Sequence, residues 1–281
     1  MAEDSKMEDL LQYGGTTDEQ KQAKELMAKL SEVLAEDLTQ VKTESKAPLF
    51  RIDLKEGFRL GRTRPLRRRS EEEQKAIDDF LKVMVEAGLI VKCQVPQAAV
   101  LVLVRRKSKI RVCVDFRMLN AGTIADIFPQ ESADEILSSF KGARYFSTLD
   151  ATSGYWQVPI EKASRYLTAF TTKRGTFMWT RVPFGLVNAP AHYNRWMEGV
   201  LAGLPVKRYV DDIIIATKTW KEHLRVLRLV LERCKEHGVK IKPSKCHIGK
   251  KEVEVLGHIV FKDGIRPNPE KVKAILDMPA Y

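Results

Sequence analysis

Helical spacing of apolar residues predicts several amphipathic helices. Leucines and valines recur three and four positions apart over residues 18–43, a spacing that predicts one helix with acidic residues in its first turn. Ser70 followed by three glutamates forms a capping box, so a second helix is expected from there to about Ala87, with Gly88 ending it. Further helices are predicted over residues 132–140, 187–202 and 222–237.

Short apolar runs bounded by turn residues predict the strands. Residues 98–104 and 110–116 are joined by the basic link 105–109, which predicts a β-hairpin with a cationic tip. Other strands are expected at residues 145–149, 213–217 and 253–261. These strands and helices do not follow a strict β-α-β order, which favours an α+β fold.

Composition and charge limit the class of protein. Of the 281 residues, 44% are hydrophobic and 30% are charged, a globular composition that excludes a disordered or low-complexity chain. The first 50 residues carry 6 bases and 11 acids, whereas the remaining residues carry 42 and 26. A folded domain as basic as residues 51–281 usually binds a polyanion, such as nucleic acid, an anionic membrane or an acidic protein. A basic surface that has no specific partner would carry the same charge.

The chain lacks the signs of a membrane or secreted protein. No apolar run approaches the roughly 18 residues of a membrane span. The four cysteines show no paired framework, which suits a reducing, intracellular compartment. The six arginines within residues 59–69 fit a solvated linker and a phosphate-contacting segment equally well. The acidic leader, residues 1–46, could dock on the body of the chain or on a partner protein.

Aspartates beside two apolar strands are the strongest candidates for chemistry. Asp211 and Asp212 adjoin the β-branched run 213–215, and taken alone they are best explained as a hairpin tip with both acids in water. Asp150 ends another apolar strand, so pairing of the two strands would bring three carboxylates to one edge of a sheet. Three neighbouring carboxylates repel one another unless positive charge balances them, and two divalent metal ions would supply that charge. Because all the ligands are oxygens, Mg²⁺ is the expected metal, with Mn²⁺ as the alternative. A site of this kind supports phosphoryl transfer.

Three motifs around these acids carry a family resemblance. They are Asp150-Ala151-Thr152-Ser153-Gly154-Tyr155-Trp156-Gln157, Pro183-Phe184-Gly185-Leu186-Val187-Asn188-Ala189-Pro190 and Tyr209-Val210-Asp211-Asp212. Residues 114–120 upstream and 255–258 downstream extend the pattern over about residues 48–280. In this order the motifs resemble those of the reverse transcriptases of gypsy-type long-terminal-repeat retrotransposons.

The resemblance implies roles for matching residues. Asp150, Asp211 and Asp212 match the metal-binding catalytic residues, with the Ala151 carbonyl as a further ligand. Lys245 matches the lysine that protonates the pyrophosphate leaving group, a general-acid role. Nucleotide contacts are expected from Arg111, Ala151, Tyr155, Phe184, Gly185 and Val210, and primer contacts from Leu256, Gly257 and His258. Tyr155 would exclude ribonucleotides by a clash at the sugar 2′ position, and Lys107 or Lys109 would add charge beside Arg111.

The resemblance also implies a right-hand polymerase fold with fingers and palm, the palm being an antiparallel sheet packed on helices. The fingers, with a basic N-terminal segment, are expected at residues 47–144 and the palm with the primer grip at 145–281. The two interleave, with part of 163–182 returning to the fingers. The sequence ends where the thumb, connection and ribonuclease H regions would begin, so the thumb is expected to be absent. A partner protein is expected either at the leader or in place of the thumb.

Three functional hypotheses follow. The first is an RNA-directed DNA polymerase that extends a primer on an RNA or DNA template with deoxynucleoside triphosphates. The second is a truncated or domesticated fragment that acts as a non-catalytic scaffold or nucleic-acid-binding subunit, which the missing thumb and the acidic leader favour. The third is a nucleic-acid-binding module without chemistry, which predicts salt-sensitive duplex binding that is indifferent to the aspartates.

Overall fold

The chain forms two compact units. The computed structural model describes residues 7, 9–37, 45–61, 63, 65–106, 109–129, 131–209 and 211–269. Unit 1 comprises the described residues within 1–36, 129–152 and 199–281, and unit 2 comprises those within 37–128 and 153–198. The chain enters each unit more than once, so neither unit is one continuous stretch. Within the described part of the chain, no helix is both long and apolar enough to cross a membrane.

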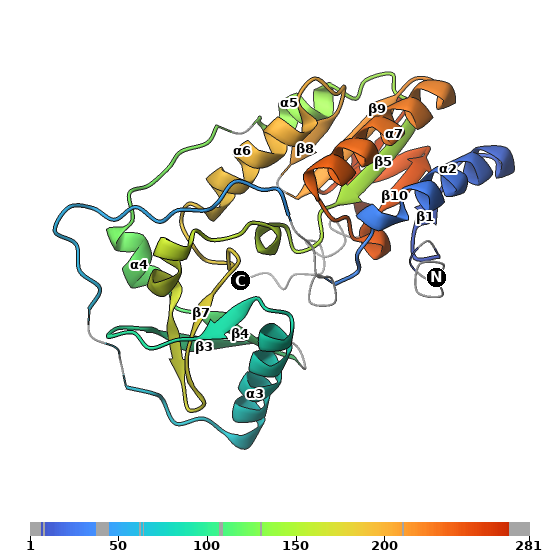
Figure 1. Ribbon diagram of the computed structural model, residues 1–281. Helices are drawn as coiled ribbons and strands as arrows, with labels where there is room; N and C mark the ends of the chain where they lie inside the picture. The colour runs from blue at the N-terminus through green and yellow to red at the C-terminus, as the bar shows by residue number, and fades with distance from the viewer. Residues whose placement is uncertain are drawn as a thin grey trace, which may run out of the picture. The chain divides into compact units, whose positions relative to one another are not determined.

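A five-stranded sheet forms the centre of unit 1 (Figure 1). Its strand order is β1-β10-β5-β9-β8, with β1 parallel to β10 and every other pair antiparallel. The strands are Gln12–Tyr13 (β1), Tyr145–Asp150 (β5), Lys207–Tyr209 (β8), Asp212–Thr217 (β9) and His247–Lys250 (β10). The strands predicted at 145–149 and 213–217 are therefore confirmed, and each is extended by one acidic residue.

Helix α7 (Trp220–His237) covers one face of this sheet. Side chains alternate between the two faces of a strand, and the face that carries Ser147 and Thr217 contacts α7 through hydrogen bonds to His223. Helix α2 (Thr17–Lys29) lies beside α7 in Figure 1 and contacts both α7 and β10. The apolar stripe of the leader is thus buried within unit 1.

The opposite face of the sheet packs on α5 (Ala133–Ser138) and on a small antiparallel sheet. The strands of this small sheet are Glu252–Val255 (β11), His258–Phe261 (β12) and Gly264–Pro267 (β13). Phe146 and Ile214 project from β5 and β9 into an apolar cluster with Ile136, Leu137, Phe140, Ala143, Val253, Val255 and Val260. The buried core therefore occupies one end of this face, and the other end carries the polar residues described below.

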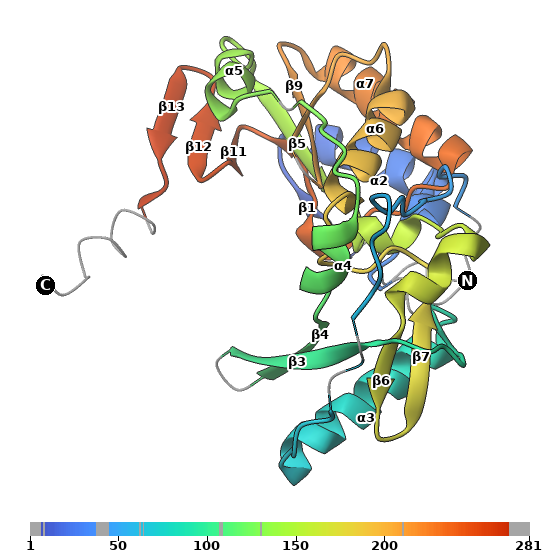
Figure 2. The same cartoon turned by 90° about the vertical axis from the view of Figure 1, so that its left-hand side faces the viewer.

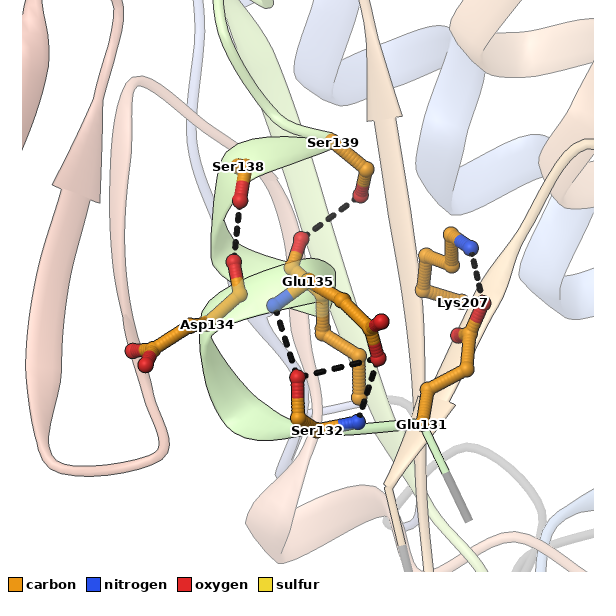
Figure 3. Close-up of polar contacts among 8 residues, drawn as sticks. Glu131, Ser132, Asp134, Glu135, Ser138, Ser139 and Lys207 are labelled. Atoms are coloured by element: carbon orange, nitrogen blue, oxygen red, sulfur yellow. Dashed lines mark hydrogen bonds and ion pairs between the residues drawn. The ribbon is translucent and has the colours of Figure 1, made fainter. Parts of the chain in front are cut away.

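Capping boxes begin the helices at the positions that local sequence predicts. At α5, Ser132 Oγ accepts a hydrogen bond from the Glu135 amide at 3.2 Å, and the Glu135 carboxylate accepts one from the Ser132 amide at 2.8 Å (Figure 3). Lys207 of β8 pairs with Glu131 at 2.5 Å in the same view, which ties the segment before α5 to the sheet. Equivalent boxes join Thr16 to Glu19 in α2 and Ser70 to Glu73 in α3.

The leader does not form the single helix predicted for residues 18–43. Helix α2 is followed by a 3-10 turn at Ser31–Val33 (η1), after which the chain runs extended. The Ala35 amide donates to the Ile241 carbonyl at 2.9 Å instead of to a carbonyl of its own helix. This long-range pairing overrides the local helix propensity. Residues 38–43 of the predicted helix lie outside the described residues.

A second five-stranded sheet, in the order β2-β7-β6-β3-β4, organises unit 2. Its strands are Ile90–Lys92 (β2), Ala99–Arg106 (β3), Lys109–Val114 (β4), Phe170–Thr172 (β6) and Gly175–Trp179 (β7). The antiparallel pair β3–β4 confirms the predicted hairpin, whose tip at 107–108 lies outside the described residues. Helix α3 (Glu71–Glu86) packs along this sheet against β2 and β4 (Figure 2).

Shorter helical elements complete unit 2. They are α4 (Arg117–Gly122), η3 (Gly154–Gln157), η4 (Lys162–Thr168) and the first part of α6 (Ala189–Leu201), whose last turn belongs to unit 1. The observed α6 confirms the helix predicted over 187–202. Helices α4, η3 and α6 each contain residues of the motifs identified in the sequence.

Candidate active site

Strands β5 and β9 bring two of the predicted acids opposite each other. In their antiparallel register Asp150 pairs with Asp212, at the end of β5 and the start of β9. Asp211 occupies the turn before β9, and its carbonyl accepts a hydrogen bond from the Ala151 amide at 3.1 Å. The three aspartates therefore converge through the strand pairing on which their prediction depended.

One cation lies beside these acids. Lys245 ends a 3-10 turn, η5 (Pro243–Lys245), and its Nζ lies 3.3 Å from Asp150 Oδ2. The Lys242 amide, just before this turn, donates to the Asp150 carbonyl at 2.8 Å. Both the backbone and the side chain of Asp150 are therefore bound to one short segment. The Lys245 side chain is 61% exposed, against 17% for that of Asp150, so the ammonium is accessible to a ligand.

A cavity of about 490 Å³ opens on this face of the sheet. It is lined by the ends of β5 and β9, by η5 and by the β11–β12 turn: Thr148, Asp150, Tyr209, Asp212, Ile214, Ser244, Lys245, His247, Glu254, Val255, Leu256 and Gly257. The even-numbered residues of β5 and β9 line the cavity because side chains alternate along a strand. Two of the three aspartates, the lysine and two predicted primer contacts thus share one cavity.

The predicted primer grip forms a tight turn, so the single strand predicted over 253–261 is wrong at this point. Leu256 and Gly257 join β11 to β12 with φ values of +54° and +80°, and Val255 pairs with His258 across the turn. Positive φ at both central residues is the requirement of a type I′ hairpin, which usually shows Asn-Gly or Asp-Gly. Because leucine stands where asparagine or aspartate usually indicates such a turn, the turn could not be predicted from the sequence.

Three of the predicted nucleotide contacts, Tyr155, Phe184 and Gly185, meet at one loop of unit 2. Tyr155 of η3 packs against Phe184 with ring centroids 5.3 Å apart, and Gly185 follows with φ +98°, a conformation that favours glycine. Asn120 of α4 holds this loop, because its Nδ2 donates to the Gly185 carbonyl at 2.7 Å and its Oδ1 accepts from the Val187 amide at 2.9 Å. The sequence had placed Asn120 at the end of a family motif without giving it a role.

The remaining predicted residues are more dispersed. Arg111 is exposed on β4, where it pairs across the hairpin with Val104. Lys109 is also exposed and begins the same strand. Ala151 is buried and forms an isolated bridge with Ile241 of unit 1. Lys107 and Val210 lie outside the described residues.

Comparison with known proteins decides the family. Residues 102–260, more than half of the chain, match the family model described as reverse transcriptase (RNA-dependent DNA polymerase). The chain belongs to the reverse transcriptase family. The predicted resemblance to gypsy-type retrotransposons is confirmed, since this reverse transcriptase is 39% identical over 212 residues to the retrovirus-related Pol polyprotein from transposon 297 of Drosophila melanogaster. It is 38% identical over 172 residues to the Pol polyprotein from transposon gypsy of the same fly.

These matches cover 72% and 60% of this reverse transcriptase but only 20% and 17% of the two polyproteins. The chain therefore spans about a fifth of the length of the curated relatives it matches. Among solved structures, the foamy viral protease-reverse transcriptase in complex with ds DNA aligns at a TM-score of 0.87 and 24% identity, over 99% of this chain and 49% of that one. The same viral protein in complex with an RNA/DNA hybrid also gives 0.87, over 99% and 37%. This likeness confirms the expected α+β right-hand polymerase fold.

Burial raises the pKa values of all three aspartates of this reverse transcriptase, and neighbouring carboxylates add to the effect at Asp211 and Asp212. Burial raises the pKa of Asp150, and the Lys245 ammonium offsets this only in part. Burial and the Asp150 charge raise the pKa of Asp211. Burial together with both other carboxylates raises the pKa of Asp212 from 3.8 to about 6. The Lys245 ammonium contacts Asp150, and the charge of the other two carboxylates makes this a site that gains free energy from a bound cation.

The oxygen donors fit a hard divalent cation. Asp211 Oδ1 is buried and has no hydrogen-bond partner within the described part of the chain, an arrangement that costs free energy unless a cation or water satisfies the oxygen. Carboxylate oxygens are the ligands that Mg²⁺ prefers. Within the described ranges, no group of three or more His, Cys, Asp or Glu side chains is already arranged to hold a metal ion. The three carboxylates thus converge without forming a cage, as their mutual repulsion would favour.

The backbone of Leu256 gives a testable consequence for stability. Leu256→Asn is expected to be more stable than Leu256→Ala by about 1 kcal/mol, since asparagine tolerates the left-handed conformation better than alanine does. Both variants lose the contact of Leu256 with the apolar cluster, so their difference isolates the backbone conformation. Urea unfolding of the two variants measures it, and equal stabilities would contradict the prediction.

Proposed function

We propose that this chain is the fingers and palm of an RNA-directed DNA polymerase, which joins a deoxynucleotide to a primer 3′-hydroxyl. The observation that carries the proposal is the pairing of Asp150 with Asp212 at a cavity that Lys245 also lines. In this proposal unit 1 acts as the palm and unit 2 as the fingers. The family to which the chain belongs supports this assignment.

The acids of unit 1 hold the metal. Asp150, Asp211 and Asp212 bind two Mg²⁺ or Mn²⁺ ions, and the Ala151 carbonyl serves as a further ligand. Bound ions supply the positive charge that lowers the pKa of the primer hydroxyl and neutralises the triphosphate. The raised pKa values of all three aspartates support this role, because a carboxylate that is costly to ionise alone gains most from a cation.

Lys245 is the general acid. After the primer hydroxyl attacks the α-phosphate, the bond to pyrophosphate breaks, and the Lys245 ammonium donates a proton to the departing oxygen. Asp150 keeps this ammonium at the site, with Nζ 3.3 Å from Oδ2. General acids of this kind contribute roughly 10²–10⁴-fold to a rate.

Unit 2 selects the nucleotide. Arg111 pairs with the triphosphate, and Lys107 or Lys109 adds positive charge nearby. The Tyr155 ring, packed on Phe184, excludes a ribose 2′-hydroxyl by steric clash. Gly185 allows the backbone to approach the nucleotide closely, and Val210 remains a predicted nucleotide contact outside the described residues.

The nucleic-acid partner is a template with its primer. Leu256 and Gly257, which line the cavity with Asp150 and Asp212, contact the primer backbone together with His258. Residues 51–281 carry 42 bases against 26 acids, which suits a polyanion held mainly through its phosphates. The foamy viral relatives in complex with ds DNA and with an RNA/DNA hybrid support a duplex ligand. Binding is expected to weaken steeply as salt rises.

A primer-extension assay on an RNA template with Mg²⁺ or Mn²⁺ tests the proposal. Incorporation of deoxynucleotides directed by the template supports it. Salt-sensitive duplex binding without incorporation at any concentration of either metal would instead favour the nucleic-acid-binding module. Recovery in a stable protein complex, again without incorporation, would favour the scaffold.

Tyr155→Val tests the sugar selection. Removing the ring is expected to reduce the preference for deoxynucleotides over ribonucleotides roughly 10- to 100-fold, because the clash at the 2′ position is lost. The ratio of kcat/KM for the two nucleotides measures the preference. Tyr166→Val, a change of an exposed tyrosine in η4, is the matched control and should leave the ratio unchanged. An unchanged ratio in Tyr155→Val would refute the role of the ring.

A further inference from the structure

Two successive sets of backbone hydrogen bonds connect the acidic leader to Asp150. Residues 33–36 run beside residues 239–242, and the Ile241 amide donates to the Val33 carbonyl at 2.8 Å. Residues 239–242 in turn run beside the end of β5, where the Lys242 amide donates to the Asp150 carbonyl at 2.8 Å. The leader is therefore built into the support of the site.

Glu36, at the end of this layer, binds the turn that carries the lysine. The Ser244 amide donates to Glu36 Oε2 at 3.2 Å, and the Ser244 hydroxyl donates to Oε1 at 2.5 Å. Lys242 Nζ lies 3.2 Å from the same Oε1. Ser244 directly precedes Lys245, so these contacts hold the residues on the N-terminal side of the lysine.

The turn η5 depends on this carboxylate for its capping. Lys242, its N-cap residue, makes no side-chain capping hydrogen bond. The first amides of a helical turn lack partners within the turn, so an acceptor from elsewhere is needed. Glu36 is that acceptor for Ser244. Three contacts to one carboxylate distinguish it from a simple surface ion pair, which contributes little.

Glu36 carries its charge at neutral pH. Partial burial alone would raise the pKa of its carboxyl group. The two hydrogen bonds from Ser244 and the neighbouring Lys242 ammonium outweigh burial and lower this pKa. An ionised acceptor makes stronger hydrogen bonds than a neutral one.

We propose that Glu36 is a positioning residue for nucleotidyl transfer, which holds Ser244 so that Lys245 stays beside Asp150. This inference rests on the proposed function, because it concerns the step in which Lys245 donates a proton to pyrophosphate. Glu36 acts through its contacts with η5, and its charge also contributes to the raised pKa of Asp150.

Kinetics of three variants test the proposal. Glu36→Ala is expected to lower kcat for incorporation about 10-fold, with KM for the nucleotide unchanged, because the general acid is displaced while nucleotide contacts remain. Glu36→Gln should lose less, since its amide oxygen still accepts one hydrogen bond from Ser244. Glu32→Ala is the control, because Glu32 belongs to the same leader but pairs with Lys235 of α7 at 2.5 Å, and it should leave kcat unchanged.

A double-mutant cycle and hydrogen exchange separate positioning from general damage. In the Lys245→Ala background, Glu36→Ala should lower kcat no further. Exchange at the Ser244 amide should accelerate in Glu36→Ala and remain slow in Glu32→Ala. A further 10-fold loss in the Lys245→Ala background, or unchanged exchange at Ser244, would overturn the proposal. An inactive parent protein would refute the proposed function, and the exchange at Ser244 would still decide whether Glu36 holds the turn.

Discussion

Asp211→Asn and Asp212→Asn are each expected to lower the rate of nucleotide incorporation on the order of 10³-fold or more, the scale of loss when a group that acts in the transition state is removed. An amide carries no charge and offers a single weak oxygen ligand where the carboxylate offers two. Both side chains belong to the set that converges with Asp150 at the end of β5. Single-nucleotide incorporation with saturating template–primer and Mg²⁺ measures the loss. Full activity in the double variant would refute the assignment of the site.

The same substitutions are expected to stabilise the fold when a chelator removes divalent cations. The pKa of Asp212 is about 6 in the folded protein, against 3.8 ordinarily. The Asp212 carboxyl group therefore makes its full contribution to the free energy of unfolding at low pH. This contribution is lost as the pH rises through about 6, because the folded protein then has to ionise the group. Asparagine avoids that loss. Neighbouring residues desolvate the carboxyl group of Asp212, but the residue keeps enough exposed surface for solvent to screen its charge, so the expected gain at pH 7 is about 1 kcal/mol.

Asp263→Asn is the matched control for both measurements. Asp263 lies in the exposed turn between β12 and β13 of the same unit, away from the three acids. Its substitution should change neither incorporation nor stability in the chelator. A less stable Asp212→Asn variant under these conditions would contradict the mutual repulsion of the carboxylates.

The free energy of unfolding is expected to fall by about 3 kcal/mol between pH 7 and pH 4 through His223 alone. His223 is fully buried on α7, with Nε2 2.6 Å from Ser147 Oγ and Nδ1 2.9 Å from Thr217 Oγ1. Burial lowers its pKa from 6.5 to about 4, and the Lys251 charge adds to the effect. The folded protein therefore holds this ring neutral.

A chain of hydrogen bonds explains why the neutral ring fits. The Gly249 amide donates to Ser147 Oγ at 3.0 Å, so the serine hydroxyl is directed to donate to His223 Nε2. The Nδ1 proton then goes to Thr217 Oγ1, whose own hydroxyl donates to the Thr219 carbonyl at 3.3 Å. A second proton on the ring would remove the acceptor for Ser147 and place a charge in a dry interior.

The direction of the effect follows from the two pKa values. The unfolded chain takes up a proton on His223 near pH 6.5, whereas the folded protein does so only near pH 4. Stability is therefore complete above pH 6.5 and falls as the pH approaches 4. Asp212 acts in the opposite direction in part of this range, so only the difference between variant and parent isolates the histidine.

Urea unfolding as a function of pH measures this difference. His223→Gln should show a shallower decline between pH 7 and pH 4 than the parent protein. His237→Gln, at the end of the same helix, should keep the slope of the parent. The same slope in His223→Gln and the parent would contradict the account of the buried ring.

Local signals explain the parts of the fold that the sequence predicted. Ser70 with Glu73 encodes the start of α3 within four residues, and Gly238 marks the end of α7 through its positive φ. The acids were predictable for a similar reason. Asp150 and Asp212 end and begin apolar runs that must pair to be buried, so their meeting depends on one strand pair.

Contacts between residues far apart in the sequence explain the features of the fold that the sequence did not predict. Helix α2 stops because the leader pairs with Ile241, more than 200 residues away in sequence. Leu256 occupies a left-handed position that residue preferences assign to asparagine or glycine. Glu36 has no local pattern that connects it to Ser244, so its role becomes visible only when residues 33–36 lie beside residues 239–242.

Strand β1 has a consequence for solubility. It pairs with β10 at the margin of the unit 1 sheet, where the Gly14 amide donates to the Ile248 carbonyl at 2.8 Å. Without β1, the amides and carbonyls on that side of β10 would be open to pairing with a strand of another molecule, the usual route to edge-to-edge aggregation. The match to the family begins only at residue 102, so a fragment trimmed to that match would lose this protection. The sheet margin, rather than the extent of sequence similarity, sets the shortest fragment that is expected to keep this edge of β10 covered.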